Sequence, residues 1–302
     1  MPIGTHATPL HRPIGIFDAG IGSYAIVELV RQHFPEQDII YFADRASFPY
    51  GMRTPAELRA SVGAAIKYLA GQGAQAVVLA SNAPSVMVLD ALRPAMPVPV
   101  LGIYPPVAAA LARSRSGHAA VLGVQSLVSS PEIRAYIATQ VQSARNTASA
   151  VATSAIAAPV AAASAAPGTS AANSIGPVAL VNASSLVAYV EDGSFLSRPE
   201  ATRQAVQAFM DRLQRELPQV DTCTLSSTHL PWLRHYFEAA APRLAFVDPA
   251  ETLLPQLQPH LSPGQGRTLC LASESETYPI AGLKEMLTRL GVNLDPIPIQ
   301  LP

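Results

Sequence analysis

The chain has 302 residues but only two cysteines, Cys223 and Cys270, and only 14% of its residues are charged. Two isolated cysteines without paired spacing argue against a disulfide framework and against a zinc site. Both lie in apolar runs, so we expect them to be small buried side chains. The seven histidines form no ligand cluster, so we predict no metal site. A net charge of −1 provides no basic field that would hold nucleic acid.

The sequence also lacks long hydrophobic runs. No stretch of about 20 strongly apolar residues is free of proline, so we expect no membrane span. Residues 1–13 contain no apolar core of the kind found in secretory signals. We therefore expect a cytoplasmic protein, and its length is enough for two domains of ordinary size.

What is present is a regular alternation of short apolar runs and segments of helical spacing. We expect strands at 14–17, 38–42, 76–80, 98–103, 119–124, 178–181, 222–225, 244–247 and 268–272. We expect helices at 25–34, 54–70, 84–92, 131–140, 199–217, 231–240 and 280–290. This alternation is typical of doubly wound α/β folds with parallel sheets. Because the pattern restarts, we predict two α/β lobes, residues 13–108 with 250–302 and residues 109–249.

Residues 142–177 interrupt this order. Alanine, serine, threonine and proline dominate the segment, and Arg145 is its only charged residue. Alanine favours a helix, but Pro159, Pro167, Gly168 and the interspersed serines break one. The side chains bury too little apolar surface to offset chain entropy. We predict a flexible surface insertion in the second lobe.

Two small polar turns follow strands about half the chain apart. Segment 81–84 (Ser-Asn-Ala-Pro) follows the apolar run 76–80, and segment 227–231 (Ser-Thr-His-Leu-Pro) follows 223–226. Each turn precedes an expected helix. In open α/β sheets, ligands bind at the carboxyl ends of strands, where such turns lie. The matching turns suggest two similar lobes that face one cleft.

These turns belong to a series of segments that, taken in order, resembles the active-site segments of glutamate racemase, in the Asp/Glu racemase superfamily. The matching segments are 14–23, 39–44, 48–51, 77–83, 186–191, 225–231 and 247–250. The sequence departs from the family pattern at both catalytic cysteines, where Ser81 and Ser227 stand. It also has Ala19 where serine is usual and Ala83 where threonine is usual.

The resemblance implies two pseudo-symmetric lobes with the site in the cleft between them, and interconversion of L- and D-glutamate for peptidoglycan without a cofactor. In that reaction one cysteine removes the Cα proton and the other returns a proton from the opposite face. Asp18 and His229 match the residues that assist the two thiols, and Glu191 resembles the acid that supports the histidine. The positions that match substrate-binding segments are Ser23, Pro49, Tyr50, Gly51, Asn82 and Thr228. The resemblance leaves open whether the chain forms a homodimer.

Two serines change this chemistry. Cysteine has a pKa of about 8.5, so its thiolate is accessible, whereas a serine hydroxyl needs strong help from a neighbour. Our leading hypothesis is a divergent protein that binds a small amino acid or dicarboxylate and has weak or lost racemase activity. The alternatives are an active racemase using Ser81 and Ser227, a related decarboxylase or isomerase, and a non-catalytic regulatory protein.

Each candidate residue also has a simpler interpretation. Asp18 is placed to cap the next helix, and the two serines are common turn residues. His229 is compatible with a packed core position, and Glu191 with a solvated turn. The segment 20–25 loosely fits a dinucleotide fingerprint.

Overall fold

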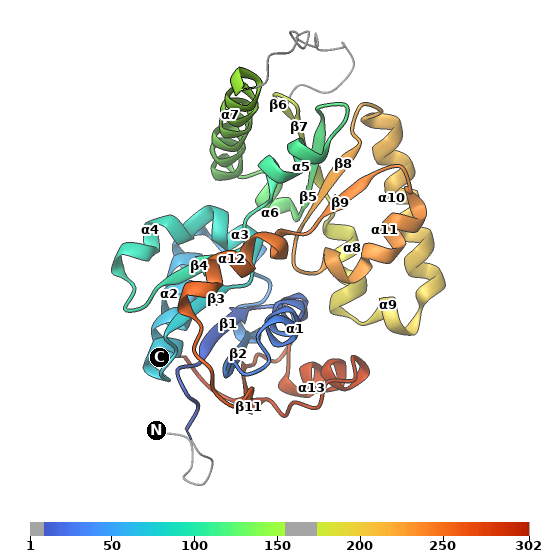
Figure 1. Ribbon diagram of the computed structural model, residues 1–302. Coiled ribbons are helices and arrows are strands. Elements are labelled where there is room, and N and C mark those ends of the chain that lie inside the picture. Colours follow the sequence, from blue (N-terminus) through green and yellow to red (C-terminus); the bar gives the residue numbers. More distant parts are fainter. Residues whose placement is uncertain (1–8, 155–173, 302) are drawn as a thin grey trace. The chain divides into compact units, whose positions relative to one another are not determined.

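The computed structural model describes residues 9–154 and 174–301. The chain divides into two compact units, Met1–Ile103 with Ala250–Pro302 (unit 1) and Tyr104–Pro249 (unit 2) (Figure 1). The first boundary lies between residues 103 and 104, whereas the sequence analysis placed it after residue 108. The predicted α/β fold with two lobes and parallel sheets is confirmed.

Unit 1 contains a six-stranded sheet in the order β11-β10-β2-β1-β3-β4, in which every pairing is parallel. Its strands are β1 (Ile14–Asp18), β2 (Ile39–Asp44), β3 (Ala76–Leu79), β4 (Val100–Gly102), β10 (Thr268–Ser273) and β11 (Ile297–Pro298). The central strands are buried on both faces, which is why they appear in the sequence as continuous apolar runs. In the register, Phe17 pairs with Phe42 and with Leu79. The carboxyl ends of β1, β2 and β3 therefore meet at one edge of this sheet.

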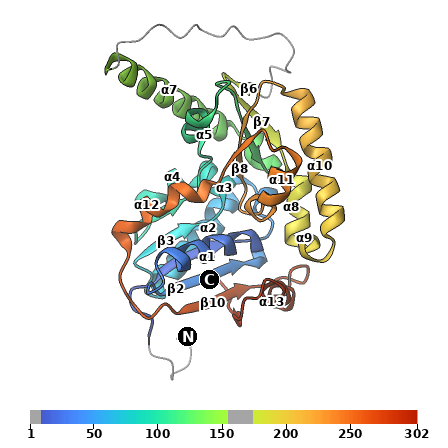
Figure 2. The same ribbon diagram turned by 45° about the vertical axis from the view of Figure 1, so that its right-hand side comes forward.

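Helices cover both faces of this sheet. They are α1 (Tyr24–His33), α2 (Pro55–Gly71), α3 (Asn82–Pro84), α4 (Asp90–Leu92), α12 (Leu253–Leu257) and α13 (Ile280–Arg289). In Figure 2, α1 lies in front of the strands and α2 behind them. Helix α2 begins with a capping box in which the Thr54 hydroxyl accepts from the Glu57 N–H and the Glu57 carboxylate accepts from the Thr54 N–H.

Unit 2 has a five-stranded sheet in the order β6-β7-β5-β8-β9. Its strands are β5 (Ala119–Gly123), β6 (Ser174–Ile175), β7 (Val178–Asn182), β8 (Thr222–Ser226) and β9 (Ala245–Val247). Only the pairing of β6 with β7 is antiparallel among the described strands. The helices are α5 (Val107–Arg113), α6 (Gln125–Val128), α7 (Pro131–Ser154), α8 (Ser184–Glu191), α9 (Ser194–Ser197), α10 (Pro199–Glu216) and α11 (Arg234–Ala240).

Helix α7 corrects part of the prediction for residues 142–177. We expected a helix at 131–140 and a flexible insertion after it, but α7 continues to Ser154. The helix breakers used in that prediction, Pro159, Pro167 and Gly168, all lie beyond this end, and residues 142–154 contain neither proline nor glycine. Alanine, the strongest helix former, therefore decides the conformation of the first part of the segment. The part at 155–173 lies outside the described residues.

The loop at 264–266, which precedes β10, is hydrogen-bonded to the segment before β2. Gly264 and Gly266 both donate their N–H groups to the Glu36 carbonyl. Gly266 has a φ of +65°, and a Cβ there would overlap the carbonyl oxygen of Pro35. The loop therefore requires glycine at position 266.

The two cysteines are buried, at 0% exposure for Cys223 and 3% for Cys270. Burial raises the pKa of each thiol to about 12, so both are neutral at ordinary pH. The prediction of buried apolar cysteines is confirmed.

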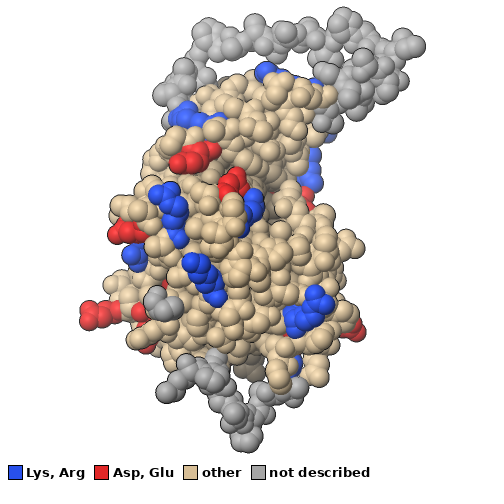
Figure 3. Space-filling model, turned by 90° about the vertical axis from the view of Figure 1, so that its left-hand side faces the viewer, with Lys and Arg blue, Asp and Glu red and all other residues tan. Residues whose placement is uncertain are grey.

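Surface charge is sparse and mixed. On the face shown in Figure 3, basic and acidic side chains are scattered and no dense basic patch covers the described surface. Within residues 9–154 and 174–301, no helix combines the length and apolarity that crossing a membrane requires. Over the same ranges, no three His, Cys, Asp or Glu side chains are grouped so that they could hold a metal ion.

Candidate functional site

The first serine turn leaves the carboxyl end of β3 and is fixed by hydrogen bonds within unit 1. Ser81 is half-buried, in extended conformation, and precedes α3. The buried Ser85 hydroxyl donates to the Ser81 carbonyl at 2.6 Å and accepts from the N–H of Ile103 at 3.0 Å. The Asn82 Nδ2 donates to the Ile103 carbonyl at 3.1 Å. The turn is therefore attached to Ile103, the last residue of the first segment of unit 1.

The side-chain oxygen of Asn82 is a buried hydrogen-bond acceptor that no described residue uses. The residue is 3% exposed, and its Oδ1 has no hydrogen-bond partner among the described residues. A buried amide oxygen without a partner costs free energy, about 1–3 kcal/mol. A ligand that brings an N–H or O–H donor to this oxygen would remove that cost.

The helix after this turn is not regular. We expected a continuous helix at 84–92, but Ser85–Leu89 forms a π-helical turn between α3 and α4. The Ser81 carbonyl accepts from both the N–H and the hydroxyl of Ser85. Single π-helical turns are frequent at functional sites.

Ser85→Ala is expected to destabilise unit 1 by about 1–3 kcal/mol, because it leaves the buried Ile103 N–H without its acceptor. The free energy of unfolding from urea denaturation checks this. Ser129→Ala is the matched control, since the exposed Ser129 hydroxyl also donates to a carbonyl, that of Gln125, and its loss should cost under about 0.5 kcal/mol. Equal effects of the two variants would contradict the anchoring role of Ser85.

The Asp18 turn lies at the end of β1, next to β3 in the same sheet. Asp18 is 4% exposed. The Ser23 hydroxyl donates to the Gly20 carbonyl at 3.0 Å and lies 3.3 Å from the Tyr41 hydroxyl. Ser23 is fully buried, so in this structure its side chain shapes the turn that follows Asp18.

The Pro49-Tyr50-Gly51 segment follows β2 and is held by two residues that the sequence analysis did not single out. The Tyr50 hydroxyl donates to Asp44 Oδ2 at 3.0 Å. Burial and the neighbouring Asp44 and Asp18 carboxylates raise the pKa of Tyr50 well above its usual value, so the phenol stays neutral. The Arg45 guanidinium lies 5.0 Å from the centre of the Phe48 ring and donates to the Ala19 carbonyl at 3.2 Å. Arg45 therefore connects this segment to the Asp18 turn.

Unit 1 thus gathers most of its predicted site residues at one edge of its sheet. Asp18 is the last residue of β1, and Tyr50 and the 81–82 turn follow the carboxyl ends of β2 and β3. Asp44, Arg45 and Ser85 support them. The position of Asp44 at the end of an expected strand could have identified it as a supporting residue. Nothing in the sequence pattern identified Ser85 as one.

The second serine turn follows β8 in unit 2. Ser227, Thr228 and His229 are 7%, 6% and 6% exposed. The Ser227 carbonyl accepts from the N–H of Leu230, which begins a short 3-10 turn, Leu230–Leu233. At the end of β8, the hydroxyls of Thr224 and Ser226 lie 2.7 Å apart.

His229 and Glu191 form a close pair within unit 2. His229 Nε2 lies 2.8 Å from Glu191 Oε2, and the side chains are 7% and 13% exposed. Glu191 is the last residue of α8, and the left-handed Gly193 comes two residues later. The carboxylate is therefore not a solvated turn acid. It holds the proton on Nε2 when the ring is neutral, which leaves Nδ1 as the nitrogen that can accept a proton.

The family model described as Asp/Glu/Hydantoin racemase matches residues 24–176, which is half of the chain. The chain belongs to this family. The Glu191–His229 pair and the 227–231 turn lie outside the matched range of the racemase family model.

Members of the racemase family are similar to the chain over different shares of their length. The glutamate racemase of Limosilactobacillus fermentum is 29% identical over 290 residues, 94% of this chain and 92% of the relative. The glutamate racemase of Roseiflexus sp. (strain RS-1) is 45% identical over 112 residues, but these span only 37% of this chain and 41% of that relative.

Two solved structures of the racemase family share the fold. Escherichia coli glutamate racemase, in complex with L-glutamate and the activator UDP-MurNAc-ala, superposes with a TM-score of 0.71 at 20% identity and covers 96% of this chain and 100% of that one. The RacE1 isoform of glutamate racemase from Bacillus anthracis gives 0.70 at 22% identity, over 97% and 98% of the two chains.

Proposed function

We propose that this chain is a divergent member of the racemase family. It binds a small amino acid or dicarboxylate, and it has weak or no two-base racemisation. In this proposal Ser81 and Ser227 occupy the places of the two catalytic cysteines. The reaction that the family resemblance implies, L- to D-glutamate interconversion for peptidoglycan, needs no cofactor.

The observation that carries the proposal is the retained His229–Glu191 pair at 2.8 Å. A histidine oriented by a carboxylate through one ring nitrogen can accept or donate a proton through the other. This pair in unit 2 supports a functional site rather than a packing histidine.

Binding of an amino acid is supported by the turn in unit 1. The unpartnered Asn82 Oδ1 accepts a hydrogen bond from a donor such as an ammonium group. The N–H groups at the start of the helical segment after Ser81 provide donors for a carboxylate. The neutral Tyr50 adds no negative charge that would repel a carboxylate.

Proton transfer at Cα is the weak step. A base must remove the Cα proton, and general-base catalysis is efficient when its pKa lies near the working pH. The serine hydroxyls at 81 and 227 are far less acidic than thiols. Asp18 and His229 match the residues that assist the two positions, but of these only His229 is held by a second carboxylate, that of Glu191, so the site as written favours one-sided proton exchange over inversion. This asymmetry is what favours the second candidate, a carbon-acid enzyme of the same superfamily that uses a single base.

Exchange of the α-proton for deuterium separates these functions. The chain is incubated in D2O with L-glutamate, D-glutamate, L-aspartate and D-aspartate separately, and the Cα–H signal is followed by NMR. We expect exchange at no more than a slow rate and on one enantiomer only. A His229→Ala variant should remove whatever exchange is seen, and Ser129→Ala is the neutral control. Rapid inversion of either glutamate enantiomer by the unmodified chain would contradict the proposal and favour an active racemase.

A further inference from the structure

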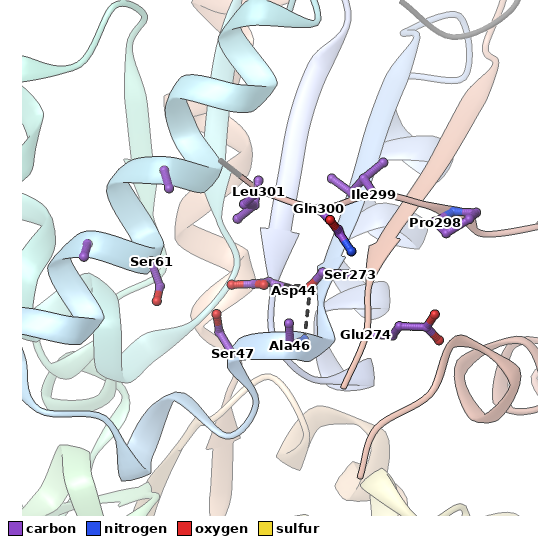
Figure 4. A pocket seen from close by; sticks show the side chains of 12 residues that line it. Asp44, Ala46, Ser47, Ser61, Ser273, Glu274, Pro298, Ile299, Gln300 and Leu301 are labelled. Carbon is purple, nitrogen blue, oxygen red and sulfur yellow. Dashed lines mark hydrogen bonds between the residues drawn. The ribbon is translucent and has the colours of Figure 1, made fainter. Parts of the chain in front are cut away.

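A cavity of about 740 Å³ lies in unit 1 at the carboxyl ends of β2 and β10. Its lining includes neither serine turn nor Asp18. The polar side chains that line it are Asp44, Ser47, Ser61, Ser273, Glu274 and Gln300. In Figure 4 the hydroxyl of Ser47 points toward Asp44, Ser61 lies on α2 to one side of them, and the Glu274 carboxylate points away from Asp44. The volume is within the range of small-molecule sites, roughly 300–1,000 Å³.

The cavity exists because α2 presents small side chains on this side. Ala60, Ser61 and Ala64 are one turn apart or closer on α2 and all line the cavity. The chain segment 298–301 forms another wall and adds the apolar side chains of Ile299 and Leu301. A larger side chain at position 64 would fill part of the space.

The charge of the lining selects the chemistry of a ligand. Asp44 and Glu274 are carboxylates, three of the remaining lining residues carry hydroxyls, and the lining contains no lysine, arginine or histidine. Because like charges repel in a partly enclosed site, a phosphate or carboxylate is disfavoured there. An ammonium group is favoured, and hydroxyl groups on the ligand match the serines.

Asp44 remains able to accept from a ligand. Its Oδ1 accepts from the Ser273 hydroxyl at 2.8 Å and its Oδ2 from the Tyr50 hydroxyl at 3.0 Å. The Ser273 hydroxyl also accepts from the Ala46 N–H at 3.1 Å. A carboxylate offers about four lone-pair sites, so these two hydroxyls leave acceptor capacity on both oxygens. The hydroxyls of Ser273 and Tyr50 also fix the orientation of the Asp44 carboxylate, which lowers the entropic cost of binding a ligand there.

We propose that this cavity is a second ligand site, which binds a small primary amine carrying several hydroxyl groups, of the amino-sugar or amino-alcohol class. The ammonium group contacts Asp44, the exposed Glu274 adds negative charge that attracts it, and the hydroxyls of the ligand contact Ser47 and Ser61. The apolar face of the ligand packs on Leu301 and on the alanines of α2. This site differs from the proposed amino-acid site because it excludes carboxylates.

Three probes that share one ring and differ in charge test the proposal with the full chain. D-Glucosamine is cationic, D-glucose is neutral and D-glucuronate is anionic. We expect saturable binding of glucosamine by titration calorimetry, glucose at least about tenfold weaker, and glucuronate without binding. No saturable binding of glucosamine, or binding of glucuronate as tight as that of glucosamine, would overturn the proposal.

Two variants locate the site, and each retains the residues of the proposed amino-acid site. Glu274→Gln removes the exposed charge but keeps an acceptor for the Ile280 N–H, and it should weaken glucosamine binding about tenfold. Ala64→Phe should abolish binding by filling the cavity, with circular dichroism reporting that the fold is kept. Glu285→Gln, an exposed acid on α13 that does not line the cavity, is the control and should bind like the unmodified chain. Undiminished binding by Glu274→Gln would place the ligand elsewhere and overturn the assignment.

Discussion

Replacing Ser81 and Ser227 together by cysteine is expected to raise glutamate racemisation by about 100-fold or more over the unmodified chain, whose activity we expect to be negligible. General acid–base catalysis contributes roughly 10²–10⁴-fold when the group has a suitable pKa. A thiol pKa of about 8.5 comes much closer to neutral pH than that of a serine hydroxyl. The double variant would restore a competent base at each turn.

The residues that assist the thiols are already present. His229 is held by Glu191 at 2.8 Å, and Asp18 lies at the end of β1 beside the strand that leads to Ser81. The gain is limited by Ala19 and Ala83, which lack the hydroxyls that the family pattern has at these positions.

Variants with a single cysteine test whether racemisation needs a base at both turns or at only one. Ser81→Cys alone or Ser227→Cys alone should give α-proton exchange with one enantiomer and little net inversion. Ser129→Cys is the control for an added exposed thiol. Circular dichroism of L- and D-glutamate at equal protein concentrations measures inversion. Robust turnover by the unmodified chain, or no gain from the double variant, would contradict the assignment of the two serines to the cysteine positions.

The fold could be predicted from the sequence because its strands are buried on both faces. Runs such as 76–80 and 119–124 are apolar at every or nearly every position, and their β-branched and small residues favour strands over helices. The alternation with helical segments then allows few topologies. The end of α7 could not be placed in the same way, because alanine-rich and serine-rich sequence is compatible with both helix and coil.

The contacts that support the candidate site were harder to predict from the sequence. Ser85 contacts Ile103, and Asp44 contacts Tyr50, through bonds that depend on where the chain returns after a strand or turn. Local periodicity contains no information about such contacts. The pairing of Glu191 with His229, 38 residues apart, was expected only from the family resemblance. The π-helical turn at 85–89 also has no local signal in the sequence that separates it from an ordinary helix.

Asp38→Ala is expected to destabilise unit 1 by about 3 kcal/mol or more at pH 7. Asp38 is fully buried at the start of β2 and joins three segments of the chain. Its Oδ1 accepts from the N–H groups of Gln265 and Arg267, at 3.0 and 2.9 Å. Its Oδ2 accepts from the N–H of His11 at 2.8 Å and from the Arg267 guanidinium at 3.1 Å. Removing one partner of a buried ion pair costs roughly 3–5 kcal/mol.

The pH dependence gives this prediction a sharper test. Burial alone would raise the pKa of Asp38, but the three backbone N–H groups and the Arg267 side chain outweigh it and hold the pKa below its ordinary value. A depressed carboxyl pKa contributes stability that is present above the unfolded pKa and is lost as the pH falls through the folded pKa. The difference between the unmodified chain and Asp38→Ala should therefore be constant from pH 7 to about pH 5 and shrink below about pH 4. Urea unfolding followed by far-UV circular dichroism at each pH measures this difference in the free energy of unfolding.

Asp295→Ala is the control, because the exposed pair of Asp295 with Lys284 contributes at most about 1 kcal/mol. A loss for Asp38→Ala that stays the same down to pH 3 would show that packing, and not the ionised carboxylate, holds these segments together.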